Sequence, residues 1–328
     1  MSNEFIDSNI TGNRIQSGIL IFSMVCVLAL IGFLMGGPIG VGVAIGLCLL
    51  VVLFGPGASP QIVLKMYKAQ PIPRQSSPQL YDLFQELVRR ADLPSSPTLY
   101  YIPSKSLNAF ATGNQSNAAV AITDGLLRIL DGREVAGVLA HEVSHIRHRD
   151  MRVLGVADTV SRIIATLSQI GQMMLFLAIP MALASGGMML LIVALLLVIS
   201  PMVSNVLQLA LSRSREFNAD LGAVSLTGDA RGLASALAKL ERVTSGTRSP
   251  WIVPGRKRPA APAMLRTHPP TDERIRLILE AGASLSTNQS IDAAQTGSAS
   301  RTGQRRIPLS EHQRVRRGPS WHVTGLWH

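Results

Sequence analysis

Two stretches of this chain contain no charged side chain, and they constrain its fold more than any other feature. No Asp, Glu, Lys or Arg lies between Arg14 and Lys65, or between Arg162 and Arg213, so each stretch is about fifty residues long. One membrane-spanning helix needs only about 20 apolar residues. Each stretch is therefore long enough for two helices joined as a hairpin.

The first stretch predicts two spans, Ser17–Met35 and Ile39–Phe54, because the glycine- and proline-rich segment 36–40 interrupts it. A secretory signal is the alternative interpretation. However, Glu4 and Asp7 precede the apolar run and no A-x-A cleavage site follows it. We expect an uncleaved anchor.

The second stretch is expected to break at residues 184–187, and its flanks are more polar than those of the first stretch. The polar and proline residues there are Gln169, Gln172, Ser200, Pro201, Ser204 and Asn205. They would also suit helices that pack against protein or lie partly in the membrane interface. The sequence leaves open whether this hairpin fully crosses the bilayer.

Two hairpins return the chain to the same side of the membrane, so all charged segments are expected to lie together. Basic residues near the span ends favour the cytoplasmic side of the cell (inner) membrane. They are Lys65, Lys68, Arg74, Arg147, Arg149, Arg152, Arg162, Arg213 and Arg215. The net charge of +11 lies mostly in these positions and in the tail, which favours anionic lipid over nucleic acid as a partner. Both cysteines, Cys26 and Cys48, lie in the first apolar stretch, so they offer neither a disulfide framework nor a zinc site.

The motif H-E-V-S-H at 141–145 is the candidate for a metal-dependent catalytic site. On a helix, the imidazoles of His141 and His145 project from one face and can converge on one metal ion, while Glu142 lies beside the ion as a possible base. Asp131 and Glu134 have the spacing of a capping box, and apolar residues follow at helical spacing. The motif is therefore predicted to lie on a helix.

A catalytic zinc site usually has three protein ligands, so a third is needed. Glu216 is the best candidate, because Asp220 follows one turn later and can accept a hydrogen bond from the free ring nitrogen of a ligand histidine. The alternative is that both carboxylates are solvated and pair with Arg213 or Arg215.

The remaining pattern predicts an α+β, mainly helical chain with a small sheet. Expected helices are 78–91, 125–130 (capped by Asp124), 132–147, 212–226, 230–243 and 271–281, and expected strands are 98–102, 108–112 and 118–123. A loop is expected at 245–266 and disorder from Gly282 onward. The expected divisions are an anchor (1–57), a first catalytic part (58–162), a second hairpin (163–211), a second catalytic part (212–281) and a basic tail (282–328).

Four motifs in this order resemble the HtpX family of membrane-bound zinc metalloproteases, relatives of the CAAX prenyl endoproteases. They are N-A-F-A-T-G at 108–113, the H-E-V-S-H helix, S-R-S-R-E-F-N-A-D at 212–220 and T-H-P-P-T-D-E-R-I at 267–275. The resemblance runs from the first hairpin to about Ala281. It implies a gluzincin-like catalytic domain fused to membrane helices.

The resemblance also implies roles for residues. His141, His145 and Glu216 would bind one zinc ion and Glu142 would be the catalytic acid/base, on the cytosolic side. The implied activity is endoproteolysis of misfolded or damaged membrane proteins under envelope stress. A scaffold with structural zinc would need a fourth protein ligand, and a zinc transporter would need ionisable residues inside the hairpins; the sequence offers neither.

Some positions have two interpretations. The strand at Asn108, Ala109 and Phe110 could hold an extended substrate, with the Asn108 side chain on a substrate carbonyl; Asn108 could equally be a turn residue. His268 could stabilise the oxyanion, as a His or Tyr does in gluzincins, or be a loop histidine held by two prolines. Arg215 is a weaker candidate for that role, and His148 is assigned to the surface or an interface.

Overall fold

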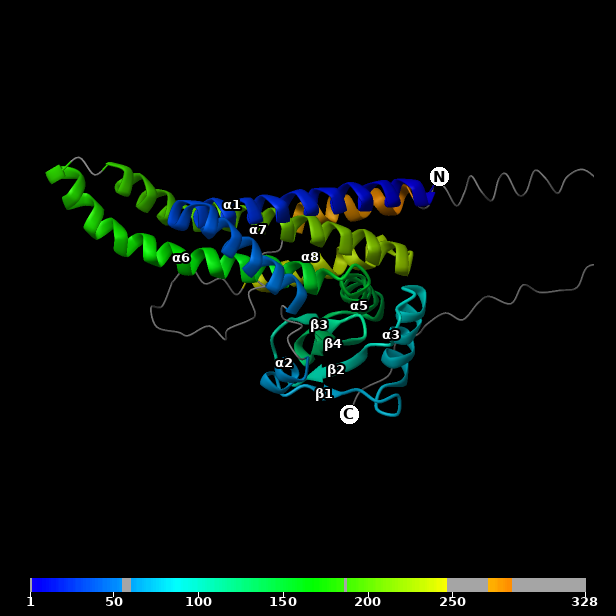
Figure 1. The fold of residues 1–328 in the computed structure, drawn as a ribbon. Coiled ribbons are helices and arrows are strands. Elements are labelled where there is room, and N and C mark those ends of the chain that lie inside the picture. Colours follow the sequence, from blue (N-terminus) through cyan, green and yellow to red (C-terminus); the bar gives the residue numbers. More distant parts are fainter. Residues whose placement is uncertain (1, 55–59, 186–187, 247–270, 285–328) are drawn as a thin grey trace, which may run out of the picture. The chain divides into compact units, whose positions relative to one another are not determined.

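The structure is a computed structural model that describes residues 2–54, 60–185, 188–246 and 271–284. Three of its helices are long and apolar enough to cross a membrane: α1 (Ser2–Phe54), α6 (Asp150–Ser185) and α7 (Met188–Thr227). A small four-stranded sheet and shorter helices complete the described part (Figure 1). The predicted fold class, a mainly helical membrane protein with a small sheet, is confirmed.

Helix α1 is two helices joined at the predicted glycine-rich break. Gly36 and Gly37 have non-helical backbone angles, and Gly37 has φ of 58°, in the left-handed region that favours glycine. After this turn, the two halves come into backbone contact at Gly32 and Gly40, because a Cβ placed on either residue would meet the carbonyl oxygen of the other. Glycine is therefore required for this close approach.

The second apolar stretch also folds as two helices, with residues 186–187 between them outside the described part. Helix α6 already begins at Asp150, well before the charge-free run, and α7 continues through Thr227. The segment 212–226, predicted as a further helix, is thus the second half of α7. The candidate ligand Glu216 lies on a direct continuation of a membrane helix.

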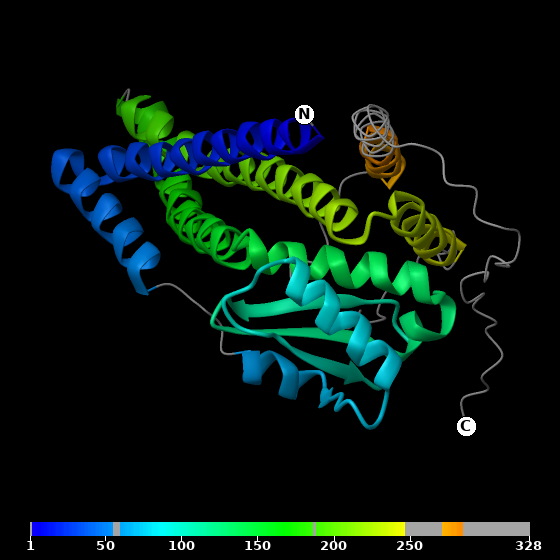
Figure 2. The same ribbon diagram turned by 90° about the vertical axis from the view of Figure 1, so that its right-hand side faces the viewer.

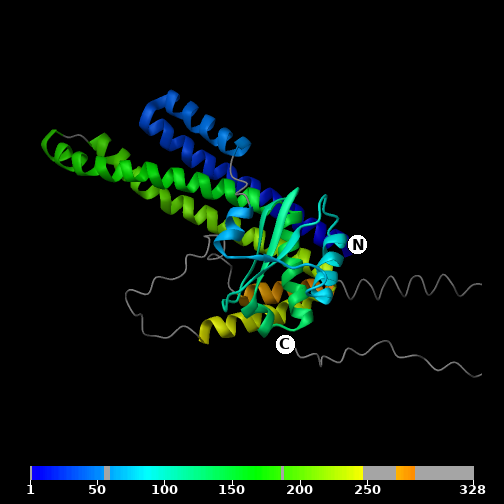
Figure 3. The ribbon, with the colours of Figure 1, turned by 90° about the horizontal axis from the view of Figure 1, so that it is seen from below.

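The three long helices pack on one another through apolar side chains. Met24 and Leu28 of α1 meet Ile164 of α6 and Leu197 of α7 in one buried cluster. The backbones of the three helices run side by side (Figures 2 and 3). The outward side chains of the same helices are large and apolar: Phe22, Ile39, Phe176 and Leu183 are 69%, 81%, 81% and 86% exposed. An exposed apolar surface of this size fits a lipid environment.

The sheet has the strand order β1-β2-β4-β3. Its strands are β1 (Gln70–Pro71), β2 (Thr98–Ile102), β3 (Ala109–Asn114) and β4 (Asn117–Thr123). Strand β2 runs parallel to β4, and β3 forms an antiparallel hairpin with β4. The three predicted strands are confirmed, whereas the two-residue β1 was not predicted. Among the described strands, β3 is an edge strand.

Helices cover both faces of the sheet. Leu139 and Val143 of helix α5 (Gly132–Arg147) pack against Val120 and Ile122 of β4. Helix α3 (Pro78–Arg90) contributes to the same apolar cluster. On the other face, Leu64 of α2 (Pro60–Met66) packs in a separate cluster. The motif helix α5 is therefore buried between the sheet and α7.

The other predicted helices are confirmed as α8 (Ala230–Gly246), the helix of residues 271–284, and α4 (Asp124–Ile129). One detail was wrong: the N-cap of α4 is Thr123, and Asp124 is the first helical residue. The predicted loop 245–266 and tail 282–328 lie outside the described residues apart from their first few positions, which are helical.

Candidate metal centre

Helix α5 begins with the predicted capping box. The Asp131 carboxylate accepts hydrogen bonds from the backbone N–H groups of Arg133 and Glu134, both at 3.0 Å. Glu134 Oε2 accepts from the Asp131 N–H at 2.9 Å. Glu134 also accepts from Ser235 Oγ at 2.6 Å and Lys239 Nζ at 2.7 Å, both on α8. The start of the motif helix is thus fixed by its own cap and by a neighbouring helix.

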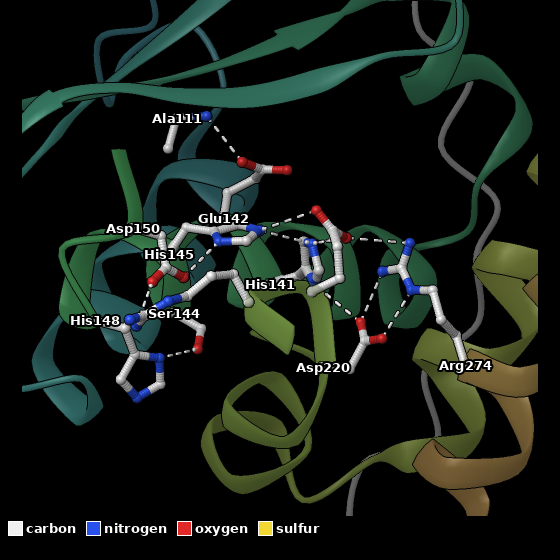
Figure 4. Close-up of polar contacts among 11 residues, drawn as sticks. Ala111, His141, Glu142, Ser144, His145, His148, Asp150, Asp220 and Arg274 are labelled. Atoms are coloured by element: carbon white, nitrogen blue, oxygen red, sulfur yellow. Dashed lines mark hydrogen bonds and ion pairs between the residues drawn. The ribbon is translucent and has the colours of Figure 1, made fainter. Parts of the chain in front are cut away.

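The three predicted ligands converge (Figure 4). The Nε2 atoms of His141 and His145 lie 3.1 Å apart. The Glu216 carboxylate oxygens lie 3.5 Å from His141 Nε2 and 3.8 Å from His145 Nε2. Two nitrogens bound to one tetrahedral zinc ion at about 2.0–2.1 Å would lie about 3.3 Å apart. The donor atoms and their spacing therefore fit a zinc ion.

A carboxylate lies behind the first histidine, at the position proposed for it from the sequence. Asp220 Oδ1 lies 2.9 Å from His141 Nδ1. Because a carboxylate only accepts, a hydrogen on Nδ1 would face Asp220 and leave the lone pair of Nε2 for a metal once His141 is neutral. Arg274 in turn donates two hydrogen bonds to Asp220, at 2.8 and 2.7 Å, and lies 3.4 Å from Glu216. Arg274 was part of a motif in the sequence, but this contact was not predicted.

The second histidine is held by a carboxylate that the sequence analysis missed. Asp150 Oδ2 lies 2.8 Å from His145 Nδ1, and Asp150 Oδ1 accepts from Arg215 Nη1 at 3.1 Å. Arg215, a weaker candidate for oxyanion stabilisation, is therefore directed at Asp150. The signal available in the sequence was an acidic residue five positions after the second histidine.

The predicted base, Glu142, contacts the edge strand. Its Oε2 accepts a hydrogen bond of 2.8 Å from the backbone N–H of Ala111 in β3. Antiparallel pairing alternates along a strand, so Ala109 and Ala111 present backbone groups to the open edge, whereas the backbone of Phe110 pairs with β4. The Phe110 ring packs against Tyr67 with centroids 5.4 Å apart, away from α5. Asn108 precedes β3, and its carbonyl accepts from the Thr123 N–H at 3.0 Å.

The electrostatics of the pocket favour a cation. Burial by itself opposes a proton on His141, but Asp220 and Glu216 outweigh burial and raise the pKa of His141 to about 10. Burial raises the pKa of Glu142, although the neighbouring histidines oppose this shift. Protons and a metal ion compete for the same ligands, so metal affinity should fall as the pH is lowered.

Two further histidines, His148 and His268, were assigned roles from the sequence. His268 lies outside the described residues. His148 is partly buried, and its Nδ1 lies 3.3 Å from Ser144 Oγ, on the side of α5 that faces α7. This position agrees with its assignment to an interface.

Known proteins share this sequence pattern. The sequence profile described as "Peptidase family M48" matches residues 74–281, more than half of the chain. The chain belongs to peptidase family M48. The matched segment includes all three ligand candidates and Glu142, so the predicted metallopeptidase class is confirmed. The family also implies a metal ion, polypeptide substrates and, with the three apolar helices, embedding in a membrane.

Curated relatives of this chain also match over most of their length. The "Protease HtpX homolog" of Methylibium petroleiphilum is 34% identical over 277 residues, which cover 80% of this chain and 95% of the relative. The homologue of Nostoc punctiforme is 35% identical over 292 residues, covering 84% and 99%. The resemblance to the HtpX family is thus confirmed. The crystal structure of Ste24p from S. mikatae matches with a TM-score of 0.43 and 17% identity, over 83% of this chain and 66% of that chain.

Proposed function

We propose that this M48 peptidase is a membrane-bound zinc endoprotease that cleaves misfolded or damaged membrane proteins at the cytosolic face of the cell (inner) membrane, as part of protein quality control under stress. One observation carries the proposal. Two histidines and a carboxylate converge within 4.8 Å of one another beside Glu142, which contacts an open strand edge. The site thus combines a metal-binding cluster with a place for an extended polypeptide.

His141, His145 and Glu216 would hold one zinc ion per chain. When bound there, zinc supplies a Lewis acid that polarises a carbonyl and makes water a stronger acid. Glu142 takes the proton of the attacking water and later passes it to the leaving amine. The hydrogen bond from Ala111 keeps the Glu142 carboxylate oriented toward the edge strand. His268 remains our candidate for stabilising the oxyanion.

The substrate would add to β3 as a further strand. The N–H and C=O of Ala109 and the C=O of Ala111 point to the open edge and can pair with an extended peptide, whereas the Ala111 N–H bonds Glu142. Asn108, immediately before the strand, is our candidate for binding a substrate carbonyl. Backbone pairing depends little on the side chains of the substrate, but it requires an extended chain, which a folded protein does not present. This requirement favours unfolded segments as substrates.

We place the site on the cytosolic side because basic residues surround the ends of the apolar helices. Cysteine labelling can test this orientation, since both native cysteines lie in the apolar part of α1. A cysteine introduced as Arg74→Cys, at an exposed position before α3, should react with a membrane-impermeant maleimide only from the cytosolic side. Labelling of intact cells from outside would contradict the orientation.

Anionic lipid is the proposed membrane partner of the basic segments. Lys65 and Lys68 are exposed at and just after α2, eleven and fourteen residues after the end of α1. Each such residue near an anionic surface contributes about 1 kcal/mol. Activity of the protein in vesicles should therefore rise with anionic lipid content, and equal activity in neutral vesicles would contradict this part of the proposal.

The decisive experiment is proteolysis by the full-length protein in detergent, with an unfolded membrane protein as substrate. Chelation should abolish cleavage and added zinc should restore it. Glu142→Gln should keep the metal and reduce the rate by about 10²–10⁴-fold, the usual contribution of a general base. Glu86→Gln, which removes an exposed carboxylate paired with Arg89 and Arg90, is the control. Retained cleavage in Glu142→Gln would refute the assignment of the base.

A further inference from the structure

Asp150 is a buried carboxylate beside the ligands, and the proposed mechanism gives it no role. It is 1% exposed and is the first residue of α6. The preceding residue, Arg149, has φ of 59°, in the left-handed region. The chain turns here between α5 and α6, with only His148 and Arg149 between the two helices. The turn places Asp150 beside His145, near the end of α5.

The two oxygens of Asp150 have different partners. Oδ2 contacts His145 Nδ1 at 2.8 Å (Figure 4), and Oδ1 accepts from Arg215 Nη1 at 3.1 Å. Arg215 is only 7% exposed and precedes the candidate ligand Glu216. Asp150 therefore links a ligand of α5 to the ligand-bearing turn of α7.

We propose that Asp150 is a positioning residue of the metal site: it fixes the ring of His145 so that Nε2 faces the metal, and Arg215 holds its charge in place. This inference rests on the proposed zinc site. It assigns a role to the first residue of a membrane helix, so that α6 as well as α7 takes part in metal binding.

The two ligand histidines are then supported in the same way by different elements. His141 is held by Asp220 and Arg274, and His145 by Asp150 and Arg215. In each case a buried arginine offsets the charge of a buried aspartate, which would otherwise be costly to bury. Because the same His–Asp–Arg arrangement occurs at both ligand histidines, Asp150 is expected to orient His145 in addition to stabilising the fold.

The β3–β4 hairpin secures the turn that presents Asp150. Gln115, at the tip of the hairpin, donates to the carbonyl of Arg147 at 3.0 Å and accepts from Arg149 Nε at 2.7 Å. Both contacts lie within three residues of Asp150. The strand that would receive the substrate is thus tied to the same turn.

Replacing Asp150 with Asn tests the role with little change of shape. An Asn side chain has one acceptor oxygen and one donor nitrogen, whereas Arg215 and His145 Nδ1 both donate. If the Asn oxygen faces Arg215, its NH₂ faces His145 Nδ1 and favours the tautomer with hydrogen on Nε2. That hydrogen occupies the position of the metal bond, so metal affinity must fall.

The experiment measures metal affinity and geometry in full-length protein in detergent. Zn²⁺ affinity is obtained by competition with a chromophoric chelator, and geometry from the visible spectrum of the Co²⁺-loaded protein. Asp150→Asn should weaken Zn²⁺ binding by about 10–100-fold, as loss of a partner behind a ligand histidine typically does, and should shift the Co²⁺ spectrum. The control is Asp158→Asn, which removes an exposed carboxylate from the same helix and should change neither.

A double variant separates positioning from folding. Asp150→Ala with Arg215→Met removes both buried charges, so it relieves the unpaired charge that either change alone would leave. If this variant has wild-type thermal stability without metal but weak Zn²⁺ binding, positioning is supported. The inference would be overturned if either the double variant or Asp150→Asn bound Zn²⁺ within twofold of the wild-type affinity and kept the wild-type Co²⁺ spectrum. A wild-type protein that binds no Zn²⁺ would instead refute the proposed function.

Discussion

Replacement of Arg274 by Met should destabilise the metal-free protein strongly. Arg274 is 5% exposed, donates two hydrogen bonds to Asp220 and lies 3.4 Å from Glu216. Burial opposes its charge, yet the two carboxylates outweigh burial and raise the pKa of Arg274. Removing the guanidinium leaves two neighbouring buried carboxylates without the arginine that they share.

The size of the loss follows from these contacts. Two hydrogen bonds to a charged group contribute about 1.5–3 kcal/mol each, or about 3–6 kcal/mol together. Breaking a buried ion pair by removing one partner costs about 3–5 kcal/mol, so the two routes agree. A loss of this size corresponds to a fall in Tm on the order of 10 °C. A bound metal ion restores positive charge beside Glu216, so the fall should be smaller in the zinc-loaded protein.

Thermal unfolding in detergent, with chelator and with zinc, measures both values. The matched control is Arg276→Met on the same helix, where Arg276 lies 3.8 Å from Glu280 and both side chains are largely exposed. An exposed pair of this kind contributes little. If Arg274→Met and Arg276→Met lower the Tm equally, or if zinc does not reduce the effect of Arg274→Met, the charge argument is wrong.

Three other predictions concern packing and pH. Gly222→Ala places a Cβ against Ser144 Oγ and should lower the free energy of unfolding by about 1–3 kcal/mol, because it overpacks α5 against α7. Thermal unfolding measures this loss, and Gly46→Ala, where a Cβ meets nothing within 4 Å, is the control. Burial by itself would raise the pKa of Glu134, but its hydrogen-bond partners outweigh burial and lower this pKa. The ionised Glu134 side chain therefore stabilises the fold at pH values above the ordinary glutamate pKa of about 4.3, and this stabilisation is lost as the pH falls. The Tm difference between wild type and Glu134→Gln should therefore shrink in acid, and a constant difference would contradict this. Gly40→Leu should separate the halves of α1 and lower the Tm in detergent, whereas Gly46→Leu should not.

Local patterns predicted much of the site. The capping box at Asp131 and Glu134 and the apolar spacing after it define α5 almost to the residue, because both signals lie within one helix. Glu216 and Asp220 could be chosen as a pair because they are one turn apart. Each of these inferences needs only the geometry of a single helix.

The rest depends on contacts between distant parts of the chain. Arg274 meets Asp220 across 54 positions, and Arg215 meets Asp150 across 65, so no periodicity reveals either pair. The role of Asp150 also requires the left-handed turn at Arg149, which the residue type does not announce because arginine rarely adopts it. Strand β1 has two residues and no pattern of its own.

Because α7 runs without a break from the apolar segment to Glu216, the thickness of the bilayer can affect the position of Glu216. A membrane helix tilts when its apolar length exceeds the local hydrocarbon thickness, at modest energetic cost. Glu216 lies only five residues beyond Leu211, the last residue of α7 in the buried membrane cluster, about 7.5 Å along the axis. A tilt that α5 does not follow would draw Glu216 away from the two histidines. At the proposed site, hydrophobic mismatch would therefore change the spacing of the three candidate ligands, and activity would depend on membrane thickness.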